Sequence, residues 1–529
     1  MMLRSLFLAL LVLALLVLAS PARADSGLRR VISADLTSVD PHLIGSEYET
    51  VVTADLFEGL TVYGPDASIQ AGLALSWDIA PDGRSYVFHL RPGLVWSDGS
   101  PLTAEDFVYS LRRALDPATG SPYSEILYPI AGARAIAEGA VKDLTTLGVT
   151  APDAVTLRIA LDRPAAFLPA ILAHSMAFPV PRAAIARWGR DWIRPEHFVG
   201  DGAFTLGEWV PQSRLSFRRN PRYHAAATVA LDRVDWLVMP DENAAYKAFR
   251  TGEVDLADLP ARLLPEARRE LPAALHDQPQ LNTRYVEIDM ARPPLSTDHR
   301  LREALALALD QTALETKVVK QGGRPAFSYV PDGMPGYTPP KQSFATLPMA
   351  ERLTRARQLW TEAGYGREHP LTLDILTDDL PDYVLEAKAI ATLWQQALPG
   401  LTVTLDTNEY QVVNARLIRH DYAISLSSWN ADFPDPWNFL AAWRRDAGTT
   451  NVIAYANPAY EAALDRAETL LDPPARMAQL AAAERLLLDD DAILPYGFGS
   501  DRTLVGAAVT GWQANAQGIH LSRYMGAAR

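Results

Sequence analysis

The sequence predicts an α/β protein built from two or three domains, and three observations support this prediction. The chain has 529 residues, which is more than one hydrophobic core usually supports. Apolar strand patterns alternate with helical patterns between residues 371 and 426, as in βαβ units around a parallel sheet. The 39 prolines and 31 glycines are spread along the chain, which indicates many connections rather than one disordered tract.

The first residues resemble an export signal. Arg4 precedes an almost unbroken apolar run over residues 6–18, and Ala22-Arg23-Ala24 follows as a small-residue cleavage site. A membrane-spanning helix is the alternative, but the apolar run is short for one. We therefore predict a cleaved signal peptide over residues 1–24 and a mature chain from about Asp25, in which no second long apolar stretch occurs.

The composition excludes several kinds of site. The chain contains no cysteine, which excludes disulfides, thiolate metal sites, a cysteine nucleophile and a lipid anchor on an N-terminal cysteine. The formal net charge is −14, which argues against nucleic acid or an anionic membrane as a partner. The sequence has no H-E-x-x-H, G-x-S-x-G, P-loop or dinucleotide glycine motif. No metal, cofactor or catalytic centre is therefore expected.

The first half of the mature chain contains clear strand patterns. Residues 86–90 and 155–161 alternate between apolar and more polar side chains, which predicts half-buried strands. The other elements predicted in this part of the chain are a strand at 28–34, a helix at 48–57, hairpin strands at 204–210 and 215–219, a strand at 232–239, a helix at 243–250, a strand at 284–289 and a long amphipathic helix at 300–320.

Residues 96–113 combine a turn with a capped helix. Asp98-Gly99 is a typical turn pair, because glycine adopts a positive φ without steric cost. Thr103 occupies the N-cap position, and Asp106 lies three residues on, where a capping box places its acid. Phe107, Leu111 and Leu115 then repeat every four residues. The pattern predicts a helix that packs one apolar face against a core.

The clearest architecture lies further along the chain. The strand and helix patterns predict a strand at 371–376, a helix at 383–397, a strand at 401–405, a helix at 410–418 and a strand at 422–426. Ligands of open α/β sheets bind beyond the carboxyl ends of the strands. The segment that follows residue 426 is therefore the first place to look for a binding site.

That segment, residues 427–436, contains aromatic residues, two acids and two prolines. Asp432 lies between Trp429 and Phe433, where a partly desolvated carboxylate would pair strongly with an ammonium group. The alternative is an acid that caps the helix expected near Pro436, a role that suits Asp435 better. Asp432 is accordingly the main candidate for contact with a ligand.

Several segments together resemble one family. They are residues 96–113, Asp40-Pro41-His42, residues 55–59, the segment around Asp432, and Leu494-Pro495. In this combination the chain resembles the extracytoplasmic solute-binding proteins of the oligopeptide, dipeptide and nickel class, which feed ABC importers. The resemblance implies a two-lobed α/β periplasmic binding protein of the Venus-flytrap type, with an additional domain beside the first lobe.

The resemblance also implies domain boundaries. The first lobe is expected to combine residues 25–57, 183–283 and 500–529, the additional domain to span 58–182, and the second lobe to span 284–499. The two chain crossings near residues 283 and 500 would form the hinge.

The same resemblance implies which residues bind the ligand. Asp432 is expected to receive a peptide α-amino group, Trp429, Tyr410, Tyr123 and Tyr285 to line the cavity, and Ser428 and Asn430 to hold the ligand main chain. For each tyrosine, a buried core or rim position is the alternative. The complete expected set is Asp432, Trp429, Asn430, Ser428, Tyr410, Tyr123, Tyr285, Asn282, Glu47 and Phe433.

The sequence departs from the family pattern at three positions. Gly45 stands where peptide-binding relatives carry an acid, and Glu47 either substitutes for it or is a solvated acid on the next helix. Leu426 replaces an arginine used for ligand carboxylates, and Gly499 replaces a tyrosine. The amine anchor is thus kept while the carboxylate end differs, which puts a generic peptide specificity in question.

The expected function is delivery of oligopeptides to an ABC permease of the inner membrane by a monomeric, non-catalytic protein. Without a lipid anchor, such a receptor is expected in the periplasm of a Gram-negative cell. Three alternatives remain open: the same class with a non-peptide solute (an opine, murein fragment, glycoside or metal chelate), a periplasmic hydrolase, and a co-receptor that presents ligand to a membrane sensor.

Overall fold

The structure is a computed structural model that describes residues 26–320 and 322–528, apart from the side chain of Glu47. The signal peptide expected over residues 1–24 therefore lies outside the described residues. Within the described ranges, no helix is both long enough and apolar enough to cross a membrane.

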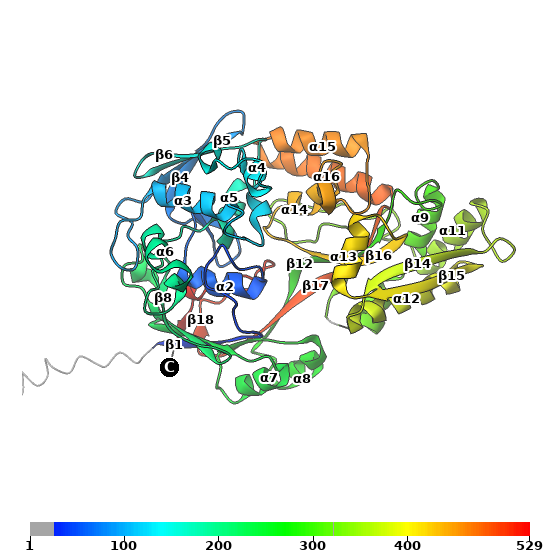
Figure 1. The fold of residues 1–529 in the computed structure, drawn as a ribbon. Coiled ribbons are helices and arrows are strands. Elements are labelled where there is room, and N and C mark those ends of the chain that lie inside the picture. Colours follow the sequence, from blue (N-terminus) through cyan, green and yellow to red (C-terminus); the bar gives the residue numbers. More distant parts are fainter. Residues whose placement is uncertain (1–25, 321, 529) are drawn as a thin grey trace, which may run out of the picture.

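One sheet of eleven strands runs through the molecule (Figure 1). In spatial order the strands are β15 (Leu401–Asn408), β14 (Leu371–Asp378), β16 (Ile424–Asn430), β12 (Leu275–Ile288), β17 (Ile493–Val505), β11 (Leu256–Asp258), β1 (Gly27–Ile32), β10 (Arg233–Val238), β9 (Arg214–Arg219) and β8 (Phe204–Val210), with β13 (Arg324–Pro325) paired to β17. At one end β14 pairs in parallel with β15 and β16, as the alternating pattern over residues 371–426 predicts. The strand β1 also pairs in parallel with β10 and β11, whereas β12 and β17 in the middle and β8–β10 at the other end pair antiparallel.

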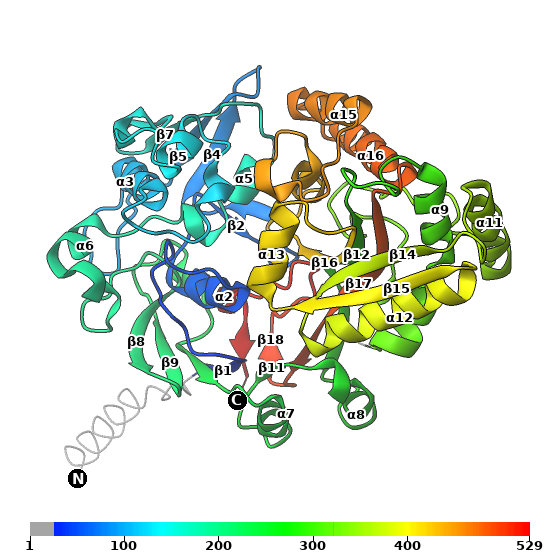
Figure 2. The ribbon, with the colours of Figure 1, turned by 45° about the vertical axis from the view of Figure 1, so that its right-hand side comes forward.

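The two long strands β12 and β17 connect the two lobes of the molecule. They pair with each other along most of their length, but the register shifts between Pro279 and Thr283. On one side of this irregular stretch β17 pairs with β11, and on the other side β12 pairs with β16. The stretch lies beside the chain crossings expected near residues 283 and 500. Figure 2 shows both strands passing through the middle of the molecule.

The first lobe is built around β1 and β8–β11. Its core contains Leu28, Phe217 and Val234, all fully buried. A buried ion pair between Glu58 and Arg523 ties the last described part of the chain to this lobe, and His224 also contacts Glu58 at 2.7 Å. Its helices and small sheet are α2 (Glu47–Leu56), α6 (Arg182–Trp188), α7 (Glu242–Arg250), α8 (Leu264–Glu270), β18 (Val509–Thr510) and β19 (Gly526–Ala527).

The additional domain contains its own antiparallel sheet in the order β4-β5-β7-β6. The capping box predicted at Thr103 is present, because Asp106 accepts a hydrogen bond from the Thr103 backbone at 2.7 Å. Phe107 and Leu111 of the capped helix are fully buried. The elements are β2 (Thr61–Tyr63), β3 (Ile69–Ala71), β4 (Ala74–Ile79), β5 (Ser85–Leu90), α3 (Ala104–Leu115), α4 (Ala133–Ala137), β6 (Val149–Asp153), β7 (Thr156–Ala160) and α5 (Leu168–Ile171).

Two elements of the second lobe differ from the sequence prediction. The helix expected at 300–320 is broken, because Leu309 is extended and Asp310 caps a new turn by accepting from the Ala313 backbone at 2.9 Å. The strand expected to end at Leu426 continues as β16 to Asn430. The helices are α9 (His299–Ala308), α10 (Gln311–Ala313), the π-helix η7 (Leu314–Val319), α11 (Met349–Glu362), α12 (Pro381–Ala397), α13 (Tyr410–Ile418), α14 (Trp437–Leu440), α15 (Pro458–Thr469) and α16 (Pro473–Asp489).

The additional domain packs against the second lobe as well as the first. Phe167 stacks on Phe433 at a ring distance of 5.4 Å and on Trp437 at 5.6 Å. These rings belong to one apolar core that continues from the additional domain into α14–α16. In Figure 1, α15 and α16 accordingly lie beside the elements of that domain. Short 3₁₀ turns complete the chain at η1 (Ser124–Leu127), η2 (Leu144–Thr146), η3 (Ser175–Ala177), η4 (Gly189–Ile193), η5 (Ala226–Thr228), η6 (Ala261–Leu263), η8 (Ala441–Trp443), η9 (Gly448–Thr450) and η10 (Ser522–Tyr524).

Candidate functional site

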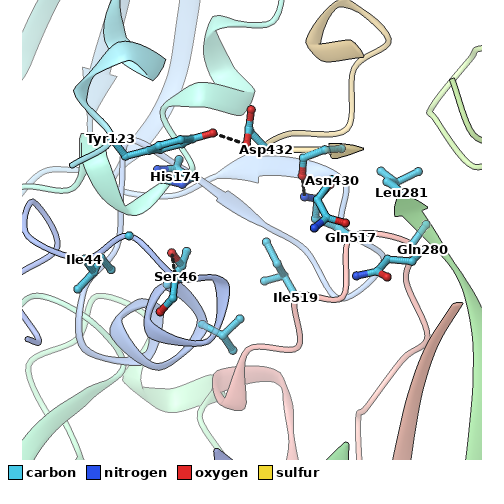
Figure 3. Close-up of a pocket in the computed structure, with 15 residues that line it drawn as sticks. Ile44, Ser46, Tyr123, His174, Gln280, Leu281, Asn430, Asp432, Gln517 and Ile519 are labelled. Carbon is cyan, nitrogen blue, oxygen red and sulfur yellow. Dashed lines mark hydrogen bonds between the residues drawn. The ribbon is translucent and has the colours of Figure 1, made fainter. Parts of the chain in front are cut away.

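A cavity of about 270 Å³ lies where the two lobes and the additional domain meet (Figure 3). Its walls come from α2 and the loop before it, from the additional domain, from the irregular stretch of β12, from the end of β16 and from the segment after β18. The lining residues are Ile44, Gly45, Ser46, Thr50, Val51, Tyr123, His174, Gln280, Leu281, Asn430, Ala431, Asp432, Ala516, Gln517 and Ile519.

Asp432 provides the charge of this cavity. Its Oδ1 accepts a hydrogen bond from the hydroxyl of Tyr123, and its Oδ2 accepts one from Nδ2 of Asn438 at 2.6 Å. Burial raises the pKa of Asp432, and the two hydrogen bonds oppose that rise only in part. Burial and the neighbouring carboxylate together raise the pKa of Tyr123, which keeps the phenol protonated as a donor.

Asn438 holds the Asp432 carboxylate in place, and sequence reasoning missed it. Its Oδ1 accepts from Nε1 of Trp429 at 3.0 Å and from the Asp432 backbone at 3.1 Å, so its Nδ2 must face the carboxylate. Asn438 lies on α14, where the Asp435 carboxylate accepts a hydrogen bond from the backbone of Trp437, the first residue of the helix, at 2.9 Å. Asp435 is itself paired with Arg476 at 2.7 Å and 2.9 Å. No motif in the sequence indicates Asn438, because its role depends on this packing.

His174 adds a neutral donor to the cavity. Its Nδ1 accepts a hydrogen bond from the Met176 backbone at 3.2 Å. Burial lowers the pKa of His174 to about 4, so the ring is neutral near pH 7 and its proton must lie on Nε2. Its ring lies 5.6 Å from that of Tyr123.

The electrostatic character of the cavity follows from these groups. Because His174 is neutral, Asp432 is the only ionised side chain among the lining residues near pH 7. No lysine or arginine pairs with its carboxylate among the described residues. A partly buried anion without a cationic partner is costly unless another group supplies the positive charge. The cavity is thus suited to a solute that carries an ammonium group.

The pleat of β16 and β12 decides which predicted residues face the cavity. Asn282 pairs with Asn430 across the two strands, and Nδ2 of Asn282 donates to Oδ1 of Asn430 at 2.8 Å. Ser428 lies on the same face but further from the cavity, where its hydroxyl is 3.0 Å from that of Tyr383. Trp429 lies on the opposite face, because successive strand residues alternate. It supports Asp432 through Asn438 instead of lining the cavity.

Three further residues of the expected set lie away from this cavity. Tyr285 is 1% exposed and packs edge-on against Tyr329 and Trp443, so it is a core residue. Phe433 is 4% exposed and stacks on Phe167, which fixes the residue next to Asp432. Tyr410, the first residue of α13, is 61% exposed and does not line the cavity.

Tyr123, Asn430 and Asp432 therefore are the predicted residues that meet in the cavity, with Asn282 beside them. Glu47 begins α2, but its side chain lies outside the described part of the structure.

The structure shows the surroundings of the three positions that depart from the family pattern. Gly45 lines the cavity, and an added Cβ there would make ordinary contact with Pro122 at 3.5 Å. Leu426 is 4% exposed in the core of the second lobe. At Gly499 an added Cβ would come within 2.8 Å of Oδ1 of Asn282. The side chain of Asn282 thus fills the space that a larger residue at position 499 would need.

The comparisons with known proteins cover most of the chain. The family model of bacterial extracellular solute-binding proteins, family 5 (middle part), matches residues 68–451. The chain is 35% identical to the probable deoxycholate-binding periplasmic protein YgiS of Escherichia coli, over 87% of this chain and 86% of YgiS. It is 34% identical to the periplasmic oligopeptide-binding protein OppA of Escherichia coli, over 90% of this chain and 88% of OppA. The unliganded open form of the murein tripeptide binding protein MppA superposes with a TM-score of 0.86 at 31% identity, covering 95% of this chain and 98% of MppA.

Proposed function

The chain belongs to family 5 of the bacterial extracellular solute-binding proteins, and we propose that it binds short peptides by their amino end and delivers them to an ABC importer of the inner membrane. The observation that carries this proposal is the Asp432 carboxylate, which is the one ionised group lining the cavity and has hydrogen-bond donors but no cationic partner among the described residues.

A peptide ammonium group supplies what this carboxylate lacks. Tyr123 and Asn438 each occupy one carboxylate oxygen, and the remaining lone pairs of both oxygens can accept the N–H groups of an ammonium ion. A charge-assisted bond of this kind is stronger in a desolvated site than in water. Binding of the ammonium group would thus offset the desolvation cost of a partly buried carboxylate that has no cationic partner among the described residues.

The proposed mechanism is closure of the two lobes around the ligand. In our proposal the first lobe comprises residues 25–57, 183–283 and 500–529, the second lobe residues 284–499, and the additional domain residues 58–182. The lobes rotate about the irregular stretch of β12 and β17, and ligand contacts to both sides favour the closed state. A closed monomer then presents its surface to the permease in the periplasm.

The proposal is tested by calorimetric titration of the mature chain with tri-alanine and with N-acetyl-tri-alanine. Loss of one partner of a desolvated charge pair costs about 2–5 kcal/mol, so Asp432→Asn should weaken tri-alanine binding by at least about 30-fold. The acetylated peptide should bind weakly to both proteins. The control is Asp82→Asn, which makes the same substitution at an exposed position outside the cavity. Equal affinity of the Asp432→Asn variant and the natural chain for tri-alanine would contradict the proposal.

Two relatives named for other ligands suggest further ligands to test. YgiS carries the name of a deoxycholate-binding protein and MppA that of a murein tripeptide binding protein, so deoxycholate and a murein tripeptide join the ligand panel. Mass spectrometry of the solute that copurifies with the chain distinguishes a set of short peptides, which supports the proposal, from one defined non-peptide molecule, which overturns it. Turnover of any ligand in the panel would indicate a hydrolase instead.

A further inference from the structure

Gln517 lines the cavity next to the proposed amine anchor, and the function proposed above gives it no role. Its side chain comes from the segment that follows β18, and the residue is 9% exposed. Nε2 of Gln517 donates a hydrogen bond to the backbone carbonyl of Ala431 at 2.6 Å. Ala431 directly precedes Asp432, so Gln517 holds the backbone next to the residue that carries the carboxylate (Figure 3).

Hydrogen-bond chemistry fixes the orientation of this amide. A backbone carbonyl can only accept a hydrogen bond, so the atom of Gln517 that faces it must be the nitrogen. The amide oxygen then points away from Ala431. Oε1 of Gln517 is buried and has no hydrogen-bond partner among the described residues.

This unpartnered oxygen sets Gln517 apart from the rest of the cavity wall. The carboxylate oxygens of Asp432 accept from Tyr123 and Asn438, and Oδ1 of Asn430 accepts from Asn282. Of the residues that line the cavity, Gln517 is the one with a buried polar side-chain atom that lacks a partner. Buried acceptors are nearly always paired. A molecule that enters the cavity can supply the missing donor.

We propose that Gln517 is a second acceptor for the amino end of the bound solute, with Oε1 taking a hydrogen bond from a ligand N–H while Asp432 pairs with the ammonium charge. This inference rests on the proposed function. The N–H belongs either to the ammonium group or to the first peptide bond. The site therefore selects solutes that combine a cationic amine with a free N–H donor.

The test couples a variant of Gln517 to the loss of single donors in the ligand. The variant is Gln517→Met, which keeps the chain length of the side chain and removes the amide. The ligands are tri-alanine, its N-methylated form (one ammonium donor fewer, same charge) and a depsipeptide in which an ester replaces the first peptide N–H. Calorimetric affinities of both proteins for all three ligands give two double-mutant cycles.

Tri-alanine should bind about tenfold more weakly to Gln517→Met than to the natural chain. One of the two analogues should show a similar loss with the natural chain and little further loss with the variant, and the identity of that analogue tells which N–H is bound. Gln342→Met is the matched control, because Gln342 is also buried with an unpartnered amide but does not line the cavity. It should leave all three affinities unchanged.

Two results would overturn the inference. Equal losses for all three ligands in Gln517→Met would mean that Gln517 acts only through its bond to Ala431, and unchanged affinities would mean that it contacts no ligand. Either result is compatible with the proposed Asp432 anchor, provided that Asp432→Asn still weakens the binding of tri-alanine. No binding of tri-alanine by the natural chain would overturn the proposed function and this inference together.

Discussion

The hydroxyl of Tyr123 donates a hydrogen bond to Oδ1 of Asp432, and this bond joins the additional domain to the second lobe at the cavity. Nδ2 of Asn438 holds the other carboxylate oxygen at 2.6 Å. The carboxylate is thus fixed in direction before a ligand arrives. Pre-organisation of this kind lowers the entropy lost when a ligand binds.

Tyr123→Phe should weaken tri-alanine binding by about three- to tenfold, the effect expected for loss of one hydrogen bond. The Tyr123 hydrogen bond lowers the pKa of Asp432, so its loss should also move the pH at which binding fails upward. Both effects are measured by calorimetric titration over a pH series. Tyr365→Phe, in the second lobe against Trp360, is the control. Tighter binding by Tyr123→Phe would show that Tyr123 competes with the ligand instead of orienting its anchor.

Binding of an amino-terminal peptide should weaken as the pH falls through the pKa of Asp432. Burial raises that pKa, so the loss should begin at a higher pH than for an exposed aspartate. Below it the affinity should fall about tenfold per pH unit, because the acid must release its proton before it pairs with the ammonium group. Below about pH 4 the protonated ring of His174 should add a further loss.

The pH dependence is checked by titrations in two buffers with different ionisation enthalpies, which report the protons released on binding. Asp432→Asn should show neither the slope nor the proton release. An affinity that rises as the pH falls from neutral would contradict the assignment of Asp432 as anchor.

Phe167→Ala should destabilise the junction between the additional domain and the second lobe. Phe167 is 8% exposed and stacks on Phe433 and Trp437, and truncation of a buried phenylalanine costs about 3–5 kcal/mol. The ion pair between Arg163 and Asp446 spans the same junction at 2.8 Å but is about half exposed. Arg163→Gln, which breaks this pair and leaves the Arg444–Asp446 pair intact, should therefore cost at most about 1 kcal/mol. Urea denaturation of both variants compares them, and equal losses would show that the stacked rings do not hold the junction.

Arg523→Met should strongly destabilise the first lobe. Arg523 and Glu58 are 5% and 1% exposed, and Arg523 also donates to the Ala54 carbonyl at 2.7 Å. Removal of one partner from a buried ion pair costs about 3–5 kcal/mol, because the other charge stays buried. Arg269→Met, which breaks an exposed pair with Glu270, is the comparison in thermal unfolding. A similar melting temperature for the two variants would contradict the role of the buried pair.

The pH dependence of stability follows from the same pair. Burial alone would raise the pKa of Glu58, but Arg523 and the hydrogen bonds from His224 and Tyr223 outweigh burial and lower it. Its folded-state pKa is thus below the unfolded value, so Glu58 stabilises the fold above the unfolded pKa. This contribution should be lost as the pH falls through the folded value.

Much of the fold was predictable because it depends on local patterns. The helix predicted at 410–418 is α13, and the capping box at Thr103 is present. The two-lobed fold class is confirmed by the superposition with MppA. The break after Ala308 was not predicted, because Asp310 fits an amphipathic helix pattern as well as it fits an N-cap.

The site was predictable only in part, because it depends on which face of a strand meets the cavity. Asn430 and Trp429 are neighbours in sequence, and a shift of one residue exchanges their faces. Only the pairing of β16 with β12 places Asn430 in the cavity and Trp429 behind it. Gln517 could not be found from its sequence surroundings, because it reaches Ala431 through a contact between residues 86 positions apart.

The wall of the cavity combines Ile44 with Gln517 and Ile519. A chain truncated before this segment would therefore lack one side of its cavity, however well its earlier domains folded. For the same reason, a fragment that stops before residue 516 should fail as a sensor or as a binding reagent even if it is stable.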